Sequence, residues 1–271
     1  MFVFLHTGDM FSNLIKKWRG YRHRFVPWIA FNLTDRSKRI VKKNIEDKIV
    51  DDSVLLDTLL KLLPRLHSAN TKFSSGEVAL KNSEVIQSVL GFCIKRAPST
   101  VPEAGIGVVV SAGNVERGSL VALYPGTLYR PHEPILFPSI GNSFVLRCID
   151  GIHVDGNDKR MSKIIYKSCV GRDSVKPHQA ADLTWLTDTP VMPLNIGQYV
   201  NNQSPGFAAN VAYQELDVPL SLLPSNLRCF LPNIWYRSSH ENNFLRLVTL
   251  VSTTKIQQGQ EVFSTYYTVV H

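Results

Sequence analysis

The spacing of apolar residues changes near residue 100. Over residues 10–25, 52–63 and 74–90, apolar side chains recur every three or four positions with polar side chains between them, which predicts helices. Beyond residue 102, apolar side chains gather in short β-branched runs separated by turn residues, which predicts short strands. We therefore expect a helical region followed by a mainly β region.

Residues that favour helix ends bound two of the predicted helices. Asp52-Ser53 can cap the start of one helix, and Pro64 should end or kink it. Ser74 and Glu77 have the spacing of a capping box at the start of the next helix, and Gly91 suits its C-terminal cap. The two helices should therefore lie within residues 44–102.

Each predicted strand is a short run that contains β-branched residues. These runs contain residues 108–110, 120–123, 144–146, 163–166 and 247–251.

One segment, residues 189–214, contains no Asp, Glu, Lys or Arg. Its prolines and asparagines argue against a membrane helix or a core helix. Side-chain amides can satisfy backbone groups that are removed from water, so we expect this irregular segment to be threaded through the interior.

The net charge of +8 is confined to one end of the chain. Residues 1–43 carry ten Lys or Arg and two acids, whereas the remaining residues carry equal numbers of each sign. This basic arm also contains aromatic residues, so residues 16–43 could hold phosphates and stack bases, which predicts a nucleic-acid partner. A solvated basic helix and a mitochondrial transit segment are the alternatives.

Composition narrows the class of protein further. The length of 271 residues and the apolar content of 44% suit one large domain, or one domain with a smaller one beside it. No apolar stretch reaches the length of about 18 residues that a membrane span needs, and the first residues lack the features of a secretory leader. The four cysteines lie far apart, so we expect no zinc site and no disulfide framework. An intracellular protein of the nucleus or cytoplasm is expected, with the mitochondrion as the alternative.

Four short motifs follow one another in the mainly β region. They are Gly105-Ile106-Gly107, Tyr124-Pro125-Gly126, Tyr199-Val200-Asn201-Asn202 and the stretch from Gly259 to Tyr267. Each motif alone is weakly specific, because glycine pairs and asparagines are also ordinary turn residues. Their order carries more information than any one of them.

In that order, the motifs resemble those of the SET-domain protein-lysine methyltransferases. The resemblance covers residues 103–271 and implies a mainly β SET-domain fold, with short strands and a pseudoknot-like threaded C-terminal segment, preceded by an α-helical N-terminal region. It divides the chain into a basic aromatic arm (1–43), a helical region (44–102) and the SET domain (103–271). Residues 127–196 are then an insertion that shapes the substrate groove.

The resemblance also implies roles for individual residues. The cofactor would be S-adenosyl-L-methionine, the substrate a lysine side chain of a protein, and no metal would take part. The expected cofactor-binding residues are Gly105, Ile106, Gly107, Asn201, Asn202 and Tyr266. The expected catalytic residues are Tyr266, Tyr124 and, as an alternative one position further on, Tyr267.

Three positions depart from the family pattern, and three extra residues separate the two ends of the third family signature. Gln198 stands where the family has Arg. Asn202 stands where the family has His, and Thr265 stands where it has Asp. A second hypothesis is therefore a SET-fold binding module without turnover. A protein-lysine methyltransferase is the first hypothesis, because an aromatic, poorly hydrated channel would disfavour the ammonium form of a lysine whose pKa in water is about 10.4.

Overall fold

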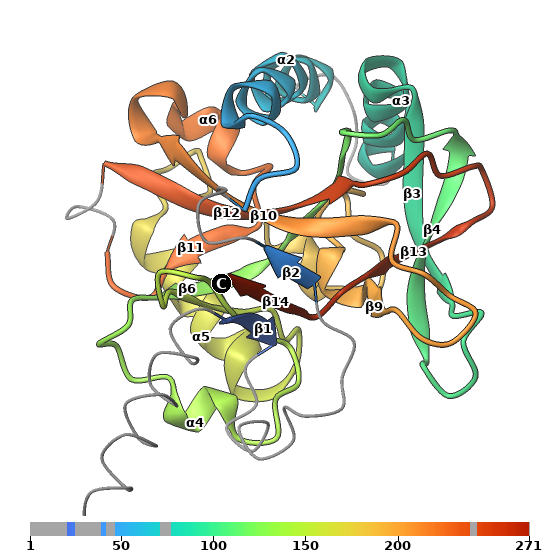
Figure 1. The fold of residues 1–271 in the computed structure, drawn as a ribbon. Coiled ribbons are helices and arrows are strands. Elements are labelled where there is room, and N and C mark those ends of the chain that lie inside the picture. Colours follow the sequence, from blue (N-terminus) through green and yellow to red (C-terminus); the bar gives the residue numbers. More distant parts are fainter. Residues whose placement is uncertain (1–20, 25–38, 42–46, 71–76, 239–242, 271) are drawn as a thin grey trace, which may run out of the picture.

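The computed structural model describes residues 21–24, 39–41, 47–70, 77–238 and 243–270 (Figure 1). Its helices are α2 (Asp52–Asn70), α3 (Val78–Leu90), α4 (Leu136–Ser139), α5 (Arg160–Asp173) and α6 (Ser225–Arg228). Its strands are β1 (Tyr21–Arg24), β2 (Arg39–Val41), β3 (Phe92–Pro98), β4 (Ile106–Gly113), β5 (Leu120–Tyr124), β6 (Gly126–Tyr129), β7 (Val145–Arg147), β8 (His153–Asp155), β9 (Asn201–Asn202), β10 (Val211–Pro219), β11 (Asn233–Trp235), β12 (Phe244–Ser252), β13 (Glu261–Ser264) and β14 (Tyr267–Val270). This set of small strands with few helices agrees with the expected SET-domain fold.

The strands form three sheets. One has seven strands in the order β11-β6-β8-β7-β1-β14-β2, one has three in the order β10-β12-β5, and one has four in the order β3-β4-β13-β9. Strands β1 and β2 come from the predicted basic arm. The predicted basic arm thus contributes two strands to a sheet that also contains strands from the second half of the chain.

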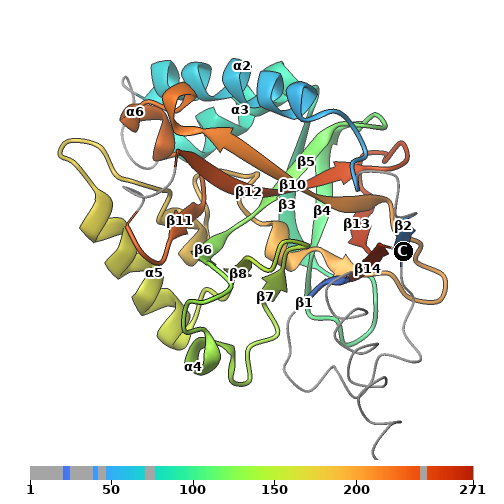
Figure 2. The ribbon, with the colours of Figure 1, turned by 60° about the vertical axis from the view of Figure 1, so that its left-hand side comes forward.

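Helices α2 and α3 lie side by side across one side of the molecule, above β10 and β12 in Figures 1 and 2. Helix α2 packs against α3, α6 and β10. Its leucines at positions 55, 59, 62, 63 and 66 are fully buried or nearly so, and they share one hydrophobic core with residues of β5, β10 and β12. The i, i+4, i+7 spacing of these leucines is the apolar face that the sequence predicts.

The chain enters α2 through a segment that a buried side chain holds in place. The fully buried Gln214 of β10 accepts a hydrogen bond from the amide of Ile49 at 2.8 Å and donates to the carbonyl of Val50 at 2.8 Å and to Asp52 at 3.1 Å. These bonds join the segment before α2 to the central three-stranded sheet.

Several expectations for the helices need correction. Residues 163–166 are not a strand but part of α5, whose buried residues Ser162, Tyr166, Cys169 and Val170 have helical spacing. Pro64 does not end α2, which continues to Asn70. Helix α3 begins at Val78 rather than Ser74, which lies outside the described residues, and it ends at Gly91 with φ of 81° as expected.

The helix expected over residues 10–25 is also wrong for residues 21–24, the part of this range that the structure describes. Tyr21–Arg24 form β1, and residues 10–20 and Phe25 lie outside the described part of the chain. Non-local pairing with β7 and β14 overrides the local spacing here.

The uncharged segment 189–214 is only partly buried. Leu194, Asn195, Ile196 and Gln198 are buried, whereas Pro205 is exposed. Asn195 has no exposed surface, and its amide donates to Asp182 at 2.7 Å and to the carbonyl of Phe230 at 3.0 Å. Its role agrees with the expectation that side-chain amides satisfy buried polar groups in this segment.

Within the described ranges, no helix combines the length and the apolar character needed to cross a membrane.

Candidate active site

Strand β13 brings three of the four motifs together (Figure 1). It pairs in antiparallel fashion with β4, where Val262 lies opposite Val108, and in parallel with β9, where Phe263 lies opposite Asn201 and Ser264 opposite Asn202. The glycine motif, the asparagine pair and the last motif are far apart in sequence, yet they lie on adjacent strands.

Glu261 at the start of β13 connects these motifs through its carboxylate. Its side chain is 5% exposed and accepts hydrogen bonds from the hydroxyl of Ser99 at 2.8 Å, and from the amide and hydroxyl of Thr100 at 2.7 and 2.6 Å. Burial raises the pKa of Glu261, but these bonds, with a further one from Asn201, outweigh burial and leave the pKa below its usual value. The carboxylate is therefore held in its ionised form.

Asn201 extends the same network toward the glycine motif. Its side-chain amide donates to Glu261 Oε1 and to the carbonyl of Ile106, both at 3.2 Å. A Cβ atom at Gly107 would lie 2.1 Å from Glu261 Oε1, so a residue with a side chain cannot occupy this position without displacing the carboxylate. The absence of a side chain at Gly107 thus leaves room for the Glu261 carboxylate, which accepts the hydrogen bond from Asn201.

Asn202 fixes the backbone of Tyr266. The amide of Tyr266 donates to Asn202 Oδ1 at 2.9 Å, and the hydroxyl of Tyr266 donates to the carbonyl of Val200 at 3.2 Å. The chain bends at Tyr266, between the end of β13 and the start of β14 at Tyr267. The structure describes the backbone of Tyr267 but not its side chain.

Tyr124 lies at the end of β5 and is completely buried. Its hydroxyl donates to the carbonyl of Phe144 at 2.7 Å, and its ring meets the ring of Tyr213 edge-on with centroids 6.1 Å apart. The hydroxyl of Tyr213 in turn accepts from the hydroxyl of Ser264, at 3.1 Å, in β13. Tyr124 and Tyr266 are thus connected through intervening residues, and both hydroxyls donate to backbone carbonyls.

Sequence reasoning gave no role to four further residues that border this region. The ring of Tyr199 meets that of Phe144 at 6.2 Å, the guanidinium of Arg96 lies 5.1 Å from the Tyr199 ring centroid, and the Tyr199 hydroxyl donates to Asp158 at 2.5 Å. Burial, followed by the hydrogen bond to Asp158, raises the pKa of Tyr199 to about 12, so its hydroxyl keeps its proton at neutral pH. Tyr199 is the first residue of the third motif, whereas Arg96, Phe144 and Asp158 belong to none of the four motifs and reach it only through the fold.

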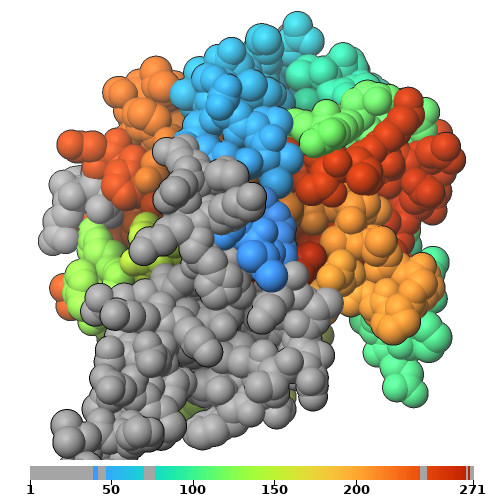
Figure 3. Space-filling model, in the orientation of Figure 1, coloured from blue at the N-terminus to red at the C-terminus, as the bar shows by residue number. Residues whose placement is uncertain are grey.

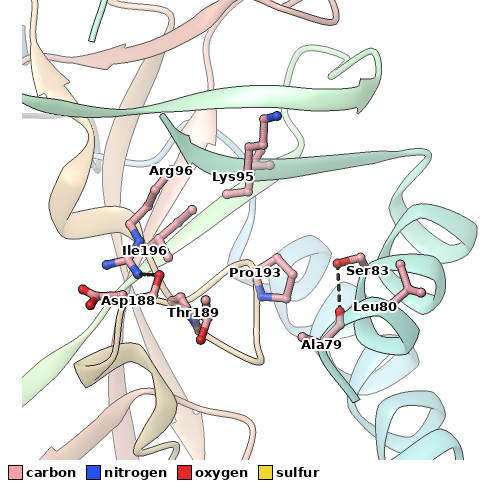
Figure 4. A pocket seen from close by; sticks show the side chains of 11 residues that line it. Ala79, Leu80, Ser83, Lys95, Arg96, Asp188, Thr189, Pro193 and Ile196 are labelled. Atoms are coloured by element: carbon pink, nitrogen blue, oxygen red, sulfur yellow. Dashed lines mark hydrogen bonds between the residues drawn. The ribbon is translucent and has the colours of Figure 1, made fainter. Parts of the chain in front are cut away.

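A cavity of about 500 Å³ lies beside Arg96. Figure 4 shows it between Ala79, Leu80 and Ser83 of α3 on one side and Arg96 and the turn at Asp188 on the other. The guanidinium of Arg96 is held by the carbonyls of Thr187, at 2.8 Å, and Asp188. None of the residues expected to bind the cofactor lines this cavity.

Five of the six residues expected to bind the cofactor form an accessible rim instead, whereas the sixth, Gly107, is buried. Gly105 and Ile106 are exposed, the latter by 44%, and Asn201, Asn202 and Tyr266 are half-buried. Gly105 has φ of +74°, and no atom lies within 4 Å of the position that a Cβ would take. A ligand can therefore approach the backbone closely at Gly105, which fits a cofactor bound along this rim.

One group of side chains among the described residues has the spacing of metal ligands. Atoms of Cys148, Asp150 and Glu215 lie within 4.8 Å of one another. The guanidinium of Arg246 already pairs with Asp150 at 2.8 Å, with Glu215 at 3.2 Å and with Asp217 at 2.5 Å. The two carboxylates of this group therefore belong to an ion-pair network centred on the Arg246 guanidinium, and none of the four motifs supplies a residue to it.

No family model matches the chain. The chain is similar to two proteins along most of its length. The chain is 42% identical over 298 residues to SET domain-containing protein 9 of Homo sapiens, with 97% of this chain and 99% of that protein covered. It is 43% identical over 240 residues to SET domain-containing protein 9 of Pongo abelii, with 89% of this chain and 85% of that protein covered.

Proposed function

The chain belongs to the SET-domain family, a methyltransferase family, and from this premise we propose that it transfers a methyl group from S-adenosyl-L-methionine to a lysine side chain of a protein. The observation that carries the proposal is the convergence of separate motifs on β13. Glu261 contacts Asn201 and closely approaches Gly107, while Asn202 holds the amide of Tyr266. A set of unrelated turn residues would have no reason to meet at one point.

In this proposal the accessible rim holds the cofactor. Gly105 and Ile106 offer exposed backbone, and Asn202 and Tyr266 border them across β9 and β13. When bound, S-adenosyl-L-methionine supplies an electrophilic methyl group on a positively charged sulfur. Glu261 does not act on it directly; its hydrogen bonds set the relative positions of the glycine motif and Asn201.

The aromatic residues provide the environment that a lysine needs. Tyr124, Phe144 and Tyr199 form a partly buried aromatic cluster, in which the charged ammonium form of an entering lysine is disfavoured. The hydroxyl oxygens of Tyr124 and Tyr266 are fixed by the carbonyls of Phe144 and Val200. Fixed oxygen atoms can orient the amine without any motion at the moment of reaction.

Two tyrosine substitutions test the proposal. We expect Tyr266→Phe to lose most methyl transfer from tritiated S-adenosyl-L-methionine to a peptide or proteome array while cofactor binding survives, because the lost hydroxyl acts mainly in the transition state. Tyr267→Phe should be milder. Tyr236→Phe is the matched control, because its ring stacks on Tyr129 rather than on any of the four motifs.

The results separate the two candidate functions. Wild-type rates from both Tyr266→Phe and Tyr267→Phe would refute the assigned roles, and a larger loss from Tyr267→Phe would move the assignment by one residue. The binding module is the second candidate, because the carbonyl oxygen of Asn202 is already occupied by the Tyr266 amide and Thr265 replaces an acid. Calorimetric binding of S-adenosyl-L-methionine without transfer to any substrate would favour it.

The partner and location of the basic arm also belong to the proposal. Most of residues 16–43 lie outside the described part of the chain, so a nucleic-acid partner there stays a prediction. We propose residence in the nucleus or cytoplasm, with the mitochondrion as the alternative. Retention on heparin that falls with salt, compared with imaging of the tagged full chain, would test the two statements separately.

A further inference from the structure

The strand that follows Tyr266 has N-terminal strands on both of its edges. Strand β14 pairs in antiparallel fashion with β1, where Arg22 lies opposite Thr268 and His23 opposite Tyr267. On its other edge it pairs in parallel with β2, where Ile40 lies opposite Val269. Within the described ranges these are the only ladder partners of β14. The three strands lie together in Figure 1.

The two N-terminal strands also connect β14 to the rest of the protein. Strand β1 pairs with β7 on its far side, where His23 lies opposite Arg147 and Arg24 opposite Leu146. In Figure 3 the blue atoms of β2 lie at the surface of the molecule. In β2, Ile40 is 61% exposed and Val41 is 7% exposed, so one side of this edge strand is seated on the protein.

Tyr266 lies at the junction of two sheets. Strand β13, whose partners are β4 and β9, ends at Ser264, and β14 begins at Tyr267. One side of the junction is held by the bond from the Tyr266 amide to Asn202. On the other side Tyr266 continues directly into β14, so β14 contributes to its position. A strand of four residues without ladder partners has no stability of its own in water.

We propose that β1 and β2 position Tyr266 by fixing β14, so that these two N-terminal strands support the active site. The effect on methyl transfer rests on the proposed function. The statement that β1 and β2 hold β14, and through it Tyr266, does not. It assigns a positioning role to residues 21–24 and 39–41, which sequence analysis grouped with a separate basic arm. A working protein must then keep these residues, so removal of a leader beyond residue 41 would disable it.

Proline substitutions in the full chain test the inference. Strand β1 lies between two neighbours, so the proline ring of Arg22→Pro should disrupt its pairing and break the strand. Arg22→Ala is the matched control, because it loses the same charge and keeps the amide. Ile40→Pro, with Ile40→Ala beside it, perturbs the edge strand β2 and is less disruptive to the rest of the sheet. Amide hydrogen exchange by mass spectrometry then compares residues 265–270 with residues 244–252 of β12.

We expect both proline variants to exchange about tenfold faster over residues 265–270, including the Tyr266 amide, because ladder bonds near it are lost. Residues 244–252 should keep their protection, and the alanine variants should match the wild type. Binding of S-adenosyl-L-methionine, measured by calorimetry, should weaken about tenfold in the proline variants alone.

Three results would overturn the inference. They are wild-type exchange over residues 265–270 in both proline variants, faster exchange in β14 with an unchanged Tyr266 amide, or equal cofactor binding by proline variants and wild type. If Arg22→Pro also exposes β12, Ile40→Pro decides the question. A wild-type protein that binds no cofactor would refute the proposed function instead, and the exchange of the Tyr266 amide would still test the positioning role.

Discussion

Replacing Glu261 by glutamine should destabilise the protein although the two side chains have the same shape. One carboxylate oxygen accepts from Ser99 and Asn201, and the other accepts from the amide and hydroxyl of Thr100. The hydroxyls can rotate to accept a hydrogen bond. The backbone amide of Thr100 and the side-chain amide nitrogen of Asn201 cannot. Whichever way the new amide turns, its NH₂ group therefore faces a donor.

The magnitude follows from the lost bond and its burial. A hydrogen bond to a buried charged acceptor contributes about 1.5–3 kcal/mol, so Glu261→Gln should lower the free energy of unfolding by about 2–3 kcal/mol. Each kcal/mol corresponds to about 2–4 °C in melting temperature for a protein of this size. The released Asn201 also contacts the Ile106 carbonyl, so cofactor affinity should fall with stability.

Urea unfolding monitored by circular dichroism measures the effect. The control is Glu116→Gln, the same change at a carboxylate that is 66% exposed and pairs with Lys255 across the surface. An exposed ion pair contributes little, so this control should change stability by less than about 1 kcal/mol. If Glu261→Gln unfolds at the same urea concentration as the control, the network around Glu261 does not hold the motifs together.

Two further predictions concern space and pH. Gly107→Ala should lower both stability and cofactor affinity, because its Cβ would lie 2.1 Å from Glu261 Oε1, whereas Gly171→Ala, in open space on α5, should stabilise by up to about 1 kcal/mol; thermal melting of both variants checks the contrast. Burial, with the nearby charge of Arg147, lowers the pKa of His153 from 6.5 to about 4 against the opposing effect of Asp150, so the fold holds the neutral imidazole. The stability that depends on neutral His153 should be fully present above pH 6.5 and lost as pH falls toward 4. In urea titrations, the free energy of unfolding of His153→Gln should therefore change less with pH between 6.5 and 4. An unchanged pH dependence in the variant would exclude His153 as the cause.

The sequence predicted correctly those helices and strands whose own residues carry a clear periodic pattern or end signal. The leucines of α2 repeat at helical intervals, Gly91 ends α3 with the expected left-handed backbone, and β5 and β12 contain the β-branched runs that mark them. The run at residues 163–166 misled for a definable reason. Three residues with high strand propensity, Ile164, Ile165 and Tyr166, lie in a longer segment whose buried positions repeat at helical spacing, and tertiary packing decided between the two.

The candidate site was predictable only as a set of motifs. Their order identified Gly107, Asn201 and Tyr266 in the sequence, but not the contacts between them. Glu261 lies within the last motif, but the sequence does not predict that its carboxylate contacts Asn201 and the segment at Ser99 and Thr100. Phe144 and Asp158 belong to none of the four motifs, and they contact Tyr199, the first residue of the third motif, only through the fold.

The pairing of β1 with β14 joins segments that are separated by almost the whole chain. During synthesis the first of these segments leaves the ribosome long before the second exists, by about 10–50 s at ordinary elongation rates. Throughout that interval β1 must remain without its eventual neighbour, and closing so long a loop is among the slowest kinds of contact to form. The pairing of β14 with β1 therefore forms after the other described strands have been synthesised, and a nascent chain that stalls before residue 266 would hold those strands without the segment that contains Tyr266.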